Sequence, residues 1–193
     1  MHPLSGTGGS TGGSILNTEP TGGVVRRGRR RLASLGPLGL IALSVVLLDH
    51  ATKILVVARM SRGSTVPILG DYFRLVYVRN SGAAFGLFRD SGTPLVFISI
   101  AASALVLLYL LAVPPERVLG RRALALVLGG AVGNMLDRIF RGGEVIDFIE
   151  MGIGRGLRWP AYNLADVAVT VGVAFLVVEF LWDARRRTHG PSA

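Results

Sequence analysis

The sequence has 193 residues, half of them hydrophobic, carries a formal net charge of +9 at pH 7 and contains no cysteine. The missing thiols exclude disulfides, cysteine nucleophiles and thiolate metal sites, and the three histidines are too far apart to form an H-E-x-x-H zinc peptidase pair. The arginines gather in short runs beside apolar segments and not on a basic surface with interleaved aromatic residues, so we do not expect nucleic-acid binding.

The amino-terminal segment, residues 1–33, is rich in Gly, Ser and Thr and contains a run of arginines near its end. Such a composition cannot bury a core, so we expect a disordered basic tail. A long apolar segment follows, from about Leu35 to Ala58, and it continues past Asp49 and Lys53 without a clear small-residue cleavage site. We therefore interpret it as a retained membrane span and not as a cleaved secretory signal.

Three further apolar segments run from about Pro94 to Val113, from about Arg122 to Phe140 and from about Tyr162 to Trp182. Each is close to the roughly 20 residues that cross a hydrocarbon core about 30 Å thick. The long linker before them contains the stretch Asp71–Val78, whose aromatic and β-branched residues predict a short strand. The Gly-rich linker 141–161 has room for a strand or a loop. We therefore predict a mostly α, polytopic membrane protein with four transmembrane helices.

The placement of basic residues predicts the orientation of these spans. Dense basic clusters occupy the amino-terminal tail, the short linker 114–121 and the carboxy-terminal run Arg185–Arg187. Such clusters mark the cytoplasmic side, and an even number of spans puts all three on one side. We expect a four-span domain over residues 34–183 and a basic tail at 184–193, with both termini in the cytoplasm.

Ionisable residues inside spans cost at least about 2.5 kcal/mol each at the membrane centre and therefore suggest function. Asp49 lies about fourteen residues into the first span, on the order of 20 Å from its cytoplasmic end at roughly 1.5 Å per residue. Polar residues of the third and fourth spans lie at the same depth: Asn134, Asp137, Arg138, Asn163 and Asp166. Three spans thus place polar groups in the outer third of the bilayer, as a common site requires.

Helical spacing sharpens this picture for the third span. Asn134, Asp137 and Arg138 share one face because they are spaced i,i+3 and i,i+4. Gly129 and Gly133 form a G-x-x-x-G pattern, which allows close helix approach in lipid. The third span is therefore predicted to pack centrally.

Asp147 follows the third span after the pair Gly142–Gly143, and a short extended return would bring it to the membrane surface, facing Asp166. Two carboxylates that share a site cannot easily both ionise, so one holds a proton near neutral pH. The ionised carboxylate can take a proton from water while the other donates one to a carbonyl oxygen. This pair is a candidate for peptide hydrolysis; the alternative is a structural pair in which one acid caps a helix and the other is solvated.

Five motifs in this order resemble the lipoprotein signal peptidase (signal peptidase II) family: Asp49-His-Ala-Thr-Lys53, Asn80-Ser-Gly-Ala-Ala-Phe-Gly86, Gly129-Gly-Ala-Val-Gly-Asn-Met-Leu-Asp-Arg138, Val145-Ile-Asp-Phe148 and Tyr162-Asn-Leu-Ala-Asp166. The resemblance extends from about Leu35 to Trp182. It implies a four-helix membrane fold with a small extracytoplasmic β-cradle. It also implies an aspartic endopeptidase that cleaves prolipoproteins just before the diacylglyceryl-modified cysteine.

The resemblance assigns the two catalytic aspartates to Asp147 and Asp166. The family's supporting polar residues fall on Asp49, Lys53, Asn80, Asn134, Asp137, Arg138 and Asn163. The sequence departs from the family at His50, where Gln is common, at Tyr162, where Phe is common, and by one extra residue between Arg138 and Asp147. These departures concern loop geometry and leave the chemistry unchanged.

The resemblance also implies partners and location. The substrates are prolipoproteins that carry a diacylglyceryl cysteine, the surroundings are membrane lipid, and a globomycin-type inhibitor is expected to bind. The location is the bacterial inner membrane, with the active site near the extracytoplasmic face. We expect no metal, no cofactor and no partner subunit, so the protein is predicted to act as a monomer.

Individual residues also have structural interpretations. Asp49 and Lys53 are spaced as a helix ion pair, which favours a positioning or structural role. Arg138 is expected to pair with Asp137 or a nearby carbonyl, and direct contact with a lipid phosphate is a lesser alternative. Interface anchoring is the expected role of the aromatic residues that flank the last span: Trp159, Tyr162 and Trp182.

Three other functions remain open at this point. A proton-coupled transporter would use intramembrane Asp and Asn as relay groups, although no inverted repeat is visible. A metal-dependent lipid phosphotransferase would hold magnesium with Asp137 and Asp147. A membrane scaffold would tolerate replacement of Asp147 and Asp166 by Asn.

Overall fold

The computed structural model describes residues 33–82, 92–154 and 156–188. Most of the predicted amino-terminal tail lies outside these ranges, as do residues 83–86 of the motif that begins at Asn80. The elements, in chain order, are α2 (Leu35–Arg59), β1 (Thr65–Leu69), β2 (Phe73–Asn80), α3 (Gly92–Ala112), α4 (Val118–Phe140), β3 (Val145–Ile153), β4 (Leu157–Arg158) and α5 (Leu164–Thr188).

All four of these helices are long and apolar enough to cross a membrane, and the strands form one small antiparallel sheet. The predicted fold class is therefore confirmed. The largest differences from the predicted spans are that α4 begins at Val118 and not at about Arg122, and that α5 continues to Thr188 and not to about Trp182. Basic residues in the last turn of a helix interact favourably with its dipole, so Arg185–Arg187 extend α5 instead of ending it.

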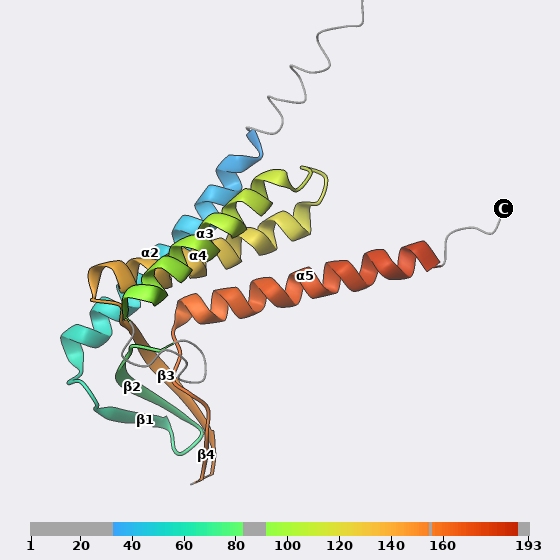
Figure 1. The fold of residues 1–193 in the computed structure, drawn as a ribbon. Helices are drawn as coiled ribbons and strands as arrows, with labels where there is room; N and C mark the ends of the chain where they lie inside the picture. The colour runs from blue at the N-terminus through green and yellow to red at the C-terminus, as the bar shows by residue number, and fades with distance from the viewer. Residues whose placement is uncertain (1–32, 83–91, 155, 189–193) are drawn as a thin grey trace, which may run out of the picture.

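The central helix of the bundle is α4, which contacts α2, α3 and α5 (Figure 1). A Cβ added at Gly129 would lie 2.7 Å from the Ala42 carbonyl oxygen of α2, and one at Gly130 would lie 2.3 Å from the Ala165 carbonyl oxygen of α5. These glycines therefore let two neighbouring backbones approach α4 closely. The predicted central packing of the third span is confirmed, with Gly130 as an additional contact point.

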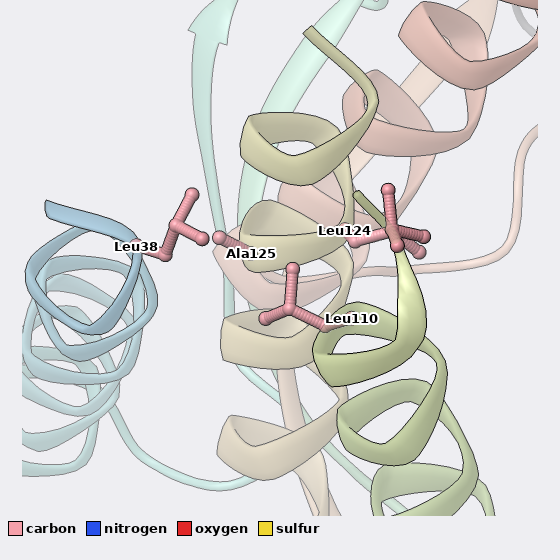
Figure 2. Packing of buried hydrophobic residues seen from close by; sticks show 5 residues of the cluster. Leu38, Leu110, Leu124 and Ala125 are labelled. Carbon is pink, nitrogen blue, oxygen red and sulfur yellow. The ribbon is translucent and has the colours of Figure 1, made fainter. Parts of the chain in front are cut away.

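A small apolar core joins α2, α3 and α4. Its buried residues include Leu38, Leu110, Leu124 and Ala125, which point toward one another from the three helices (Figure 2). Most other large apolar side chains of the helices are exposed. Lipid tails solvate such side chains as well as a protein interior does. The inner and outer faces of these spans therefore differ little in their content of apolar residues.

The sheet has the strand order β1-β2-β3-β4. It lies at the end of the bundle opposite the connection between α3 and α4 (Figure 1). The predicted strand at 71–78 corresponds to β2, two residues further along, whereas β1 was not predicted because Pro67 interrupts a short segment. The linker 141–161 forms β3 and β4, after Gly142 (φ 66°) and Gly143 (φ 89°) reverse the chain.

A second buried cluster fixes the sheet to the helices. It consists of Val56 from α2, Tyr77 from β2, and Ile146 and Phe148 from β3. Successive side chains of a strand point to opposite faces, so Asp147 points away from the face that carries Ile146 and Phe148. This anchoring sets the position of Asp147 relative to the helix ends.

Candidate active site

The polar residues predicted from the sequence meet where the sheet joins the ends of α2, α4 and α5. Asp147 is 3% exposed in β3 and accepts two amide hydrogen bonds. Asn80 Nδ2 donates to its Oδ2 at 2.9 Å, and Asn163 Nδ2 donates to its Oδ1 at 2.7 Å. Register explains the first contact, because β2 pairs with β3 beside Asn80 and Asp147.

Burial raises the pKa of the Asp147 carboxyl from 3.8 to about 6. The hydrogen bonds from Asn80 and Asn163 favour the ionised form and partly oppose this rise, while the charge of Asp166 adds to it. A carboxyl with this pKa keeps its proton up to a pH much closer to 7 than a solvated aspartate does.

Asp166 lies in the first turn of α5 and takes part in a helix cap. Asn163 precedes the helix, and its Oδ1 accepts the Asp166 backbone N–H at 3.0 Å. In return, Asp166 Oδ2 accepts the Asn163 backbone N–H at 3.2 Å. This reciprocal pair is a capping box. Asn134 Nδ2 of α4 donates to the remaining oxygen, Oδ1, at 2.8 Å.

A buried ion triad lies beneath the two aspartates. Lys53, Asp49 and Asp137 are almost completely inaccessible to solvent. Lys53 Nζ lies 2.7 Å from Asp49 Oδ2 and 2.8 Å from Asp137 Oδ2, and it donates to Asn134 Oδ1 at 3.2 Å. Buried charges persist only when they are paired and hydrogen-bonded, and this triad satisfies that condition.

The two acids of the triad also bind backbone next to the candidate catalytic residues. Asp137 Oδ2 accepts the N–H of Ile146, the residue before Asp147, at 3.2 Å. Asp49 Oδ1 accepts the N–H of Ala165, the residue before Asp166, at 3.0 Å. One lysine thus links the carboxylates that hold both backbone segments.

The ion pair at the end of α4 is not the expected one between Arg138 and Asp137. Asp137 Oδ1 pairs with Arg141 Nε at 2.9 Å, and no ion pair or side-chain hydrogen bond involves Arg138 within the described residues. Adjacent helical residues are about 100° apart around the axis, whereas residues i and i+4 are neighbours. The i,i+4 spacing could have identified Arg141 from the sequence. The charge of Arg138 interacts with the charges of three acids: Asp166, Asp147 and Asp137.

Beside Asp166 lies an open cavity of about 600 Å³. Its walls are mainly apolar: Met151, Ile153 and Leu157 from the sheet, Trp159, and Val167 and Val171 from α5. The cavity offers an apolar chain a place next to a carboxylate at the end of a membrane span.

The geometry also weighs on the alternative functions. Asp137 directs its oxygens to Lys53, Arg141 and the Ile146 N–H, whereas Asp147 faces Asn80 and Asn163. These two acids therefore do not form the pair of magnesium ligands that a phosphotransferase would need. Within the described residues, the polar groups of the site lie at one end of the bundle and do not form a chain across it, which disfavours a proton relay.

Comparisons with known proteins agree on one family. Residues 41–182 match the family model described as signal peptidase (SPase) II. The lipoprotein signal peptidase of Syntrophus aciditrophicus is 40% identical over 151 residues, which cover 75% of this chain and 91% of that protein. The lipoprotein signal peptidase of Syntrophotalea carbinolica is 42% identical over 151 residues, covering 77% and 92%.

Two solved structures share the fold of this chain. A bacterial membrane enzyme superposes with a TM-score of 0.72 at 28% identity, covering 82% of this chain and 95% of the other. A second bacterial membrane enzyme superposes with a TM-score of 0.67 at 30% identity, covering 76% and 93%. The similarity therefore covers about three quarters or more of this chain.

Proposed function

This chain belongs to the signal peptidase II family, and from this membership we propose that it removes signal peptides from bacterial prolipoproteins by an aspartic mechanism. The family makes it a multi-pass membrane protease. The observation that carries the aspartic mechanism is the pair Asp147 and Asp166, which share Asn163 as a hydrogen-bond partner beside an apolar cavity.

In the proposed reaction Asp147 is the acid and Asp166 the base. The raised pKa of Asp147, about 6, supports a protonated acid that donates to the carbonyl oxygen of the scissile peptide. Asp166 takes a proton from the attacking water as its oxygen bonds to the carbonyl carbon. When the tetrahedral intermediate collapses, Asp166 gives that proton to the leaving amine and Asp147 recovers its own from the hydroxyl. Both acids return to their starting forms.

The other polar residues hold this pair in place. Asn80, Asn134 and Asn163 donate to carboxylate oxygens of the two acids and fix their rotamers. The triad Asp49, Lys53 and Asp137 positions the backbone that precedes each acid. The charge of Arg138 favours an ionised carboxylate at the site. All of these residues come from one chain, which supports a monomeric enzyme.

The proposed substrate class follows from the family, and the cavity is compatible with it. Its apolar walls suit the lipid chains or the apolar signal segment of a prolipoprotein, while Asp166 at its edge reaches the peptide. From the family resemblance we propose cleavage just before a diacylglyceryl-modified cysteine, and the same cavity is the proposed position of a globomycin-type inhibitor. The basic clusters support an orientation with both termini in the cytoplasm and the site near the extracytoplasmic face.

Processing of a diacylglyceryl-modified prolipoprotein by the purified protein in detergent, with a chelator present throughout, tests this mechanism. Replacing a general acid or base costs about 10²- to 10⁴-fold in rate, so Asp147→Asn and Asp166→Asn should each lose at least about 100-fold. Asp183→Asn, whose exposed ion pair with Arg117 lies outside the site, is the matched control. Equal cleavage by folded Asp147→Asn and Asp166→Asn proteins would refute the aspartic mechanism.

A further inference from the structure

The end of the sheet farthest from the helices exposes large apolar side chains. This sheet tip comprises Leu69 (66% exposed), Tyr72 (64%), Ile153 (72%), Leu157 (65%) and Trp159 (70%). The turn between β1 and β2 meets the end of β3 there, since the Gly152 N–H donates to the Tyr72 carbonyl at 3.0 Å. Figure 1 shows this turn and β4 together at the end of the sheet. The exposed residues thus gather from both hairpins.

Such a patch needs a nonaqueous partner. Soluble proteins rarely leave a large contiguous apolar surface in water, and β1 exposes apolar residues on both of its faces, since every residue from Thr65 to Leu69 is exposed. A single protein-facing surface would leave one face of the strand polar. Exposure on both faces fits immersion in a surrounding apolar medium better than docking on one side.

The tip is continuous with the lipid-facing surface of α5. Ile153, Leu157 and Trp159 form one wall of the cavity whose other wall includes Val167 and Val171 of the span. Val171 is itself exposed toward the surroundings of the helix bundle. An apolar path therefore runs from the membrane span to the sheet tip without a polar break among these residues, and Trp and Tyr are the side chains that favour the membrane interface.

Charges near the tip neutralise one another. Arg74 pairs with Glu150, and Arg158 pairs with both Glu150, at 3.4 Å, and Asp71, at 3.5 Å. Among the residues that the structure describes here, these two arginines balance the two acids in charge. The described residues of the tip therefore offer apolar side chains, and not net charge, for a membrane contact.

We propose that the sheet tip is a membrane anchor, which inserts into the boundary between headgroups and acyl chains of the leaflet beside the site. The anchor holds the sheet over the flank of α5 and keeps the cavity open toward the bilayer. The proposal depends on the exposed surface alone and holds whether or not the aspartic mechanism is correct.

The absence of cysteine from the sequence allows a direct test with single spin labels. The variants Leu69→Cys and Ile153→Cys report the tip, Glu116→Cys in the connection between α3 and α4 reports water, and Val171→Cys reports the bilayer. Each full-length protein is reconstituted in vesicles of neutral phospholipid and in vesicles containing anionic phospholipid. The measurement is the accessibility of each label to oxygen, which partitions into lipid, relative to a water-soluble nickel complex.

We expect the ratio of oxygen to nickel accessibility at the two tip labels to exceed that of the Glu116→Cys reference several-fold and to be equal in both kinds of vesicle. Tip labels that match the Glu116→Cys reference would place the tip in water and overturn the proposal. Insertion confined to anionic vesicles would also overturn it, because charge and not apolar surface would then hold the tip. Thermal unfolding of each labelled protein verifies that it remains folded.

Discussion

Asn163 connects the two candidate catalytic acids through separate parts of its side chain. Its amide nitrogen donates to Asp147 Oδ1 and its oxygen caps α5 by accepting the Asp166 N–H. The side chain is completely buried, so neither contact competes with bulk water. The same residue therefore orients an acid on the sheet and an acid on a helix, and any shift of α5 relative to β3 is transmitted to both.

The burial of Asp147 predicts a pH-dependent stability. Its folded pKa of about 6 lies above its ordinary value of 3.8, so its contribution is fully present below pH 3.8 and is lost as the pH rises through 6. A shift of this size corresponds to about 3 kcal/mol at most. Asp147→Asn stays neutral at every pH. Relative to wild type, it should therefore gain thermal stability between pH 4.5 and pH 8, as measured by unfolding in detergent.

The matched control for this experiment is Glu116→Gln, which removes an exposed acid from the connection between α3 and α4. Its stability relative to wild type should be the same at both pH values. A constant difference between Asp147→Asn and wild type across this range would show that Asp147 does not titrate as its buried position requires.

Replacing Lys53 should lower the free energy of unfolding, because it removes the only cation of the buried triad. In Lys53→Met, Asp49 and Asp137 would face each other without the ammonium that lies 2.7 and 2.8 Å from them. Removing one partner of a buried pair costs about 3–5 kcal/mol, and denaturant titration in mixed micelles should show a loss in this range. Arg62→Met breaks the exposed pair with Glu144 and should cost less than about 1 kcal/mol. Equal losses in the two variants would mean that the triad is not buried.

Among the elements, α4 determines the geometry of the site, because small residues allow the neighbouring helices to approach it closely. Gly130 faces the first turn of α5, and Gly172 of α5 in turn faces Ala123 and Val127 of α4. These close contacts place Asn134 within hydrogen-bonding distance of Asp166. Residues that make no contact with substrate thus decide whether the two acids meet.

Gly130→Ala tests this dependence. The added methyl group would lie 2.3 Å from the Ala165 carbonyl oxygen, a backbone atom that cannot rotate away. The helices must separate beside Asp166, so we expect a stability loss of about 1–3 kcal/mol together with reduced prolipoprotein cleavage. At Gly36 of α2 nothing lies within 4 Å of the added methyl, so Gly36→Ala should leave cleavage unchanged. Full activity in Gly130→Ala would contradict the role given to this contact.

The sequence predicted these helices well because lipid imposes a length and an apolar composition on each of them. It predicted their ends less well, since Arg185–Arg187 can either continue a helix or leave it. Strand β1 was missed because five residues containing a proline carry little β signal. Helical spacing placed Asp49, Asp137 and Asp166 at one depth. The i,i+4 spacing of Asp137 and Arg141 could also have predicted their ion pair, whereas Arg138 was expected as the partner.

At the scale of the whole molecule, the sheet and the helix bundle each contribute part of the candidate active site. The bundle supplies one acid, Asp166, and the ion triad, while the sheet supplies the other acid, Asp147. The apolar cavity lies between the two parts and opens beside α5. The proposed site of peptide hydrolysis is thus the junction of a membrane span with the sheet, where the lipid-modified end of a prolipoprotein would lie.

The most direct test of the central claim is the mass of both products released from a diacylglyceryl-modified prolipoprotein by the purified enzyme. We expect an intact signal peptide with a free carboxylate and a lipoprotein that begins at its lipid-modified cysteine. Neither product should form when Asp147→Asn or Asp166→Asn replaces the wild type. Cleavage at another bond, or the same products from either folded variant, would contradict the account.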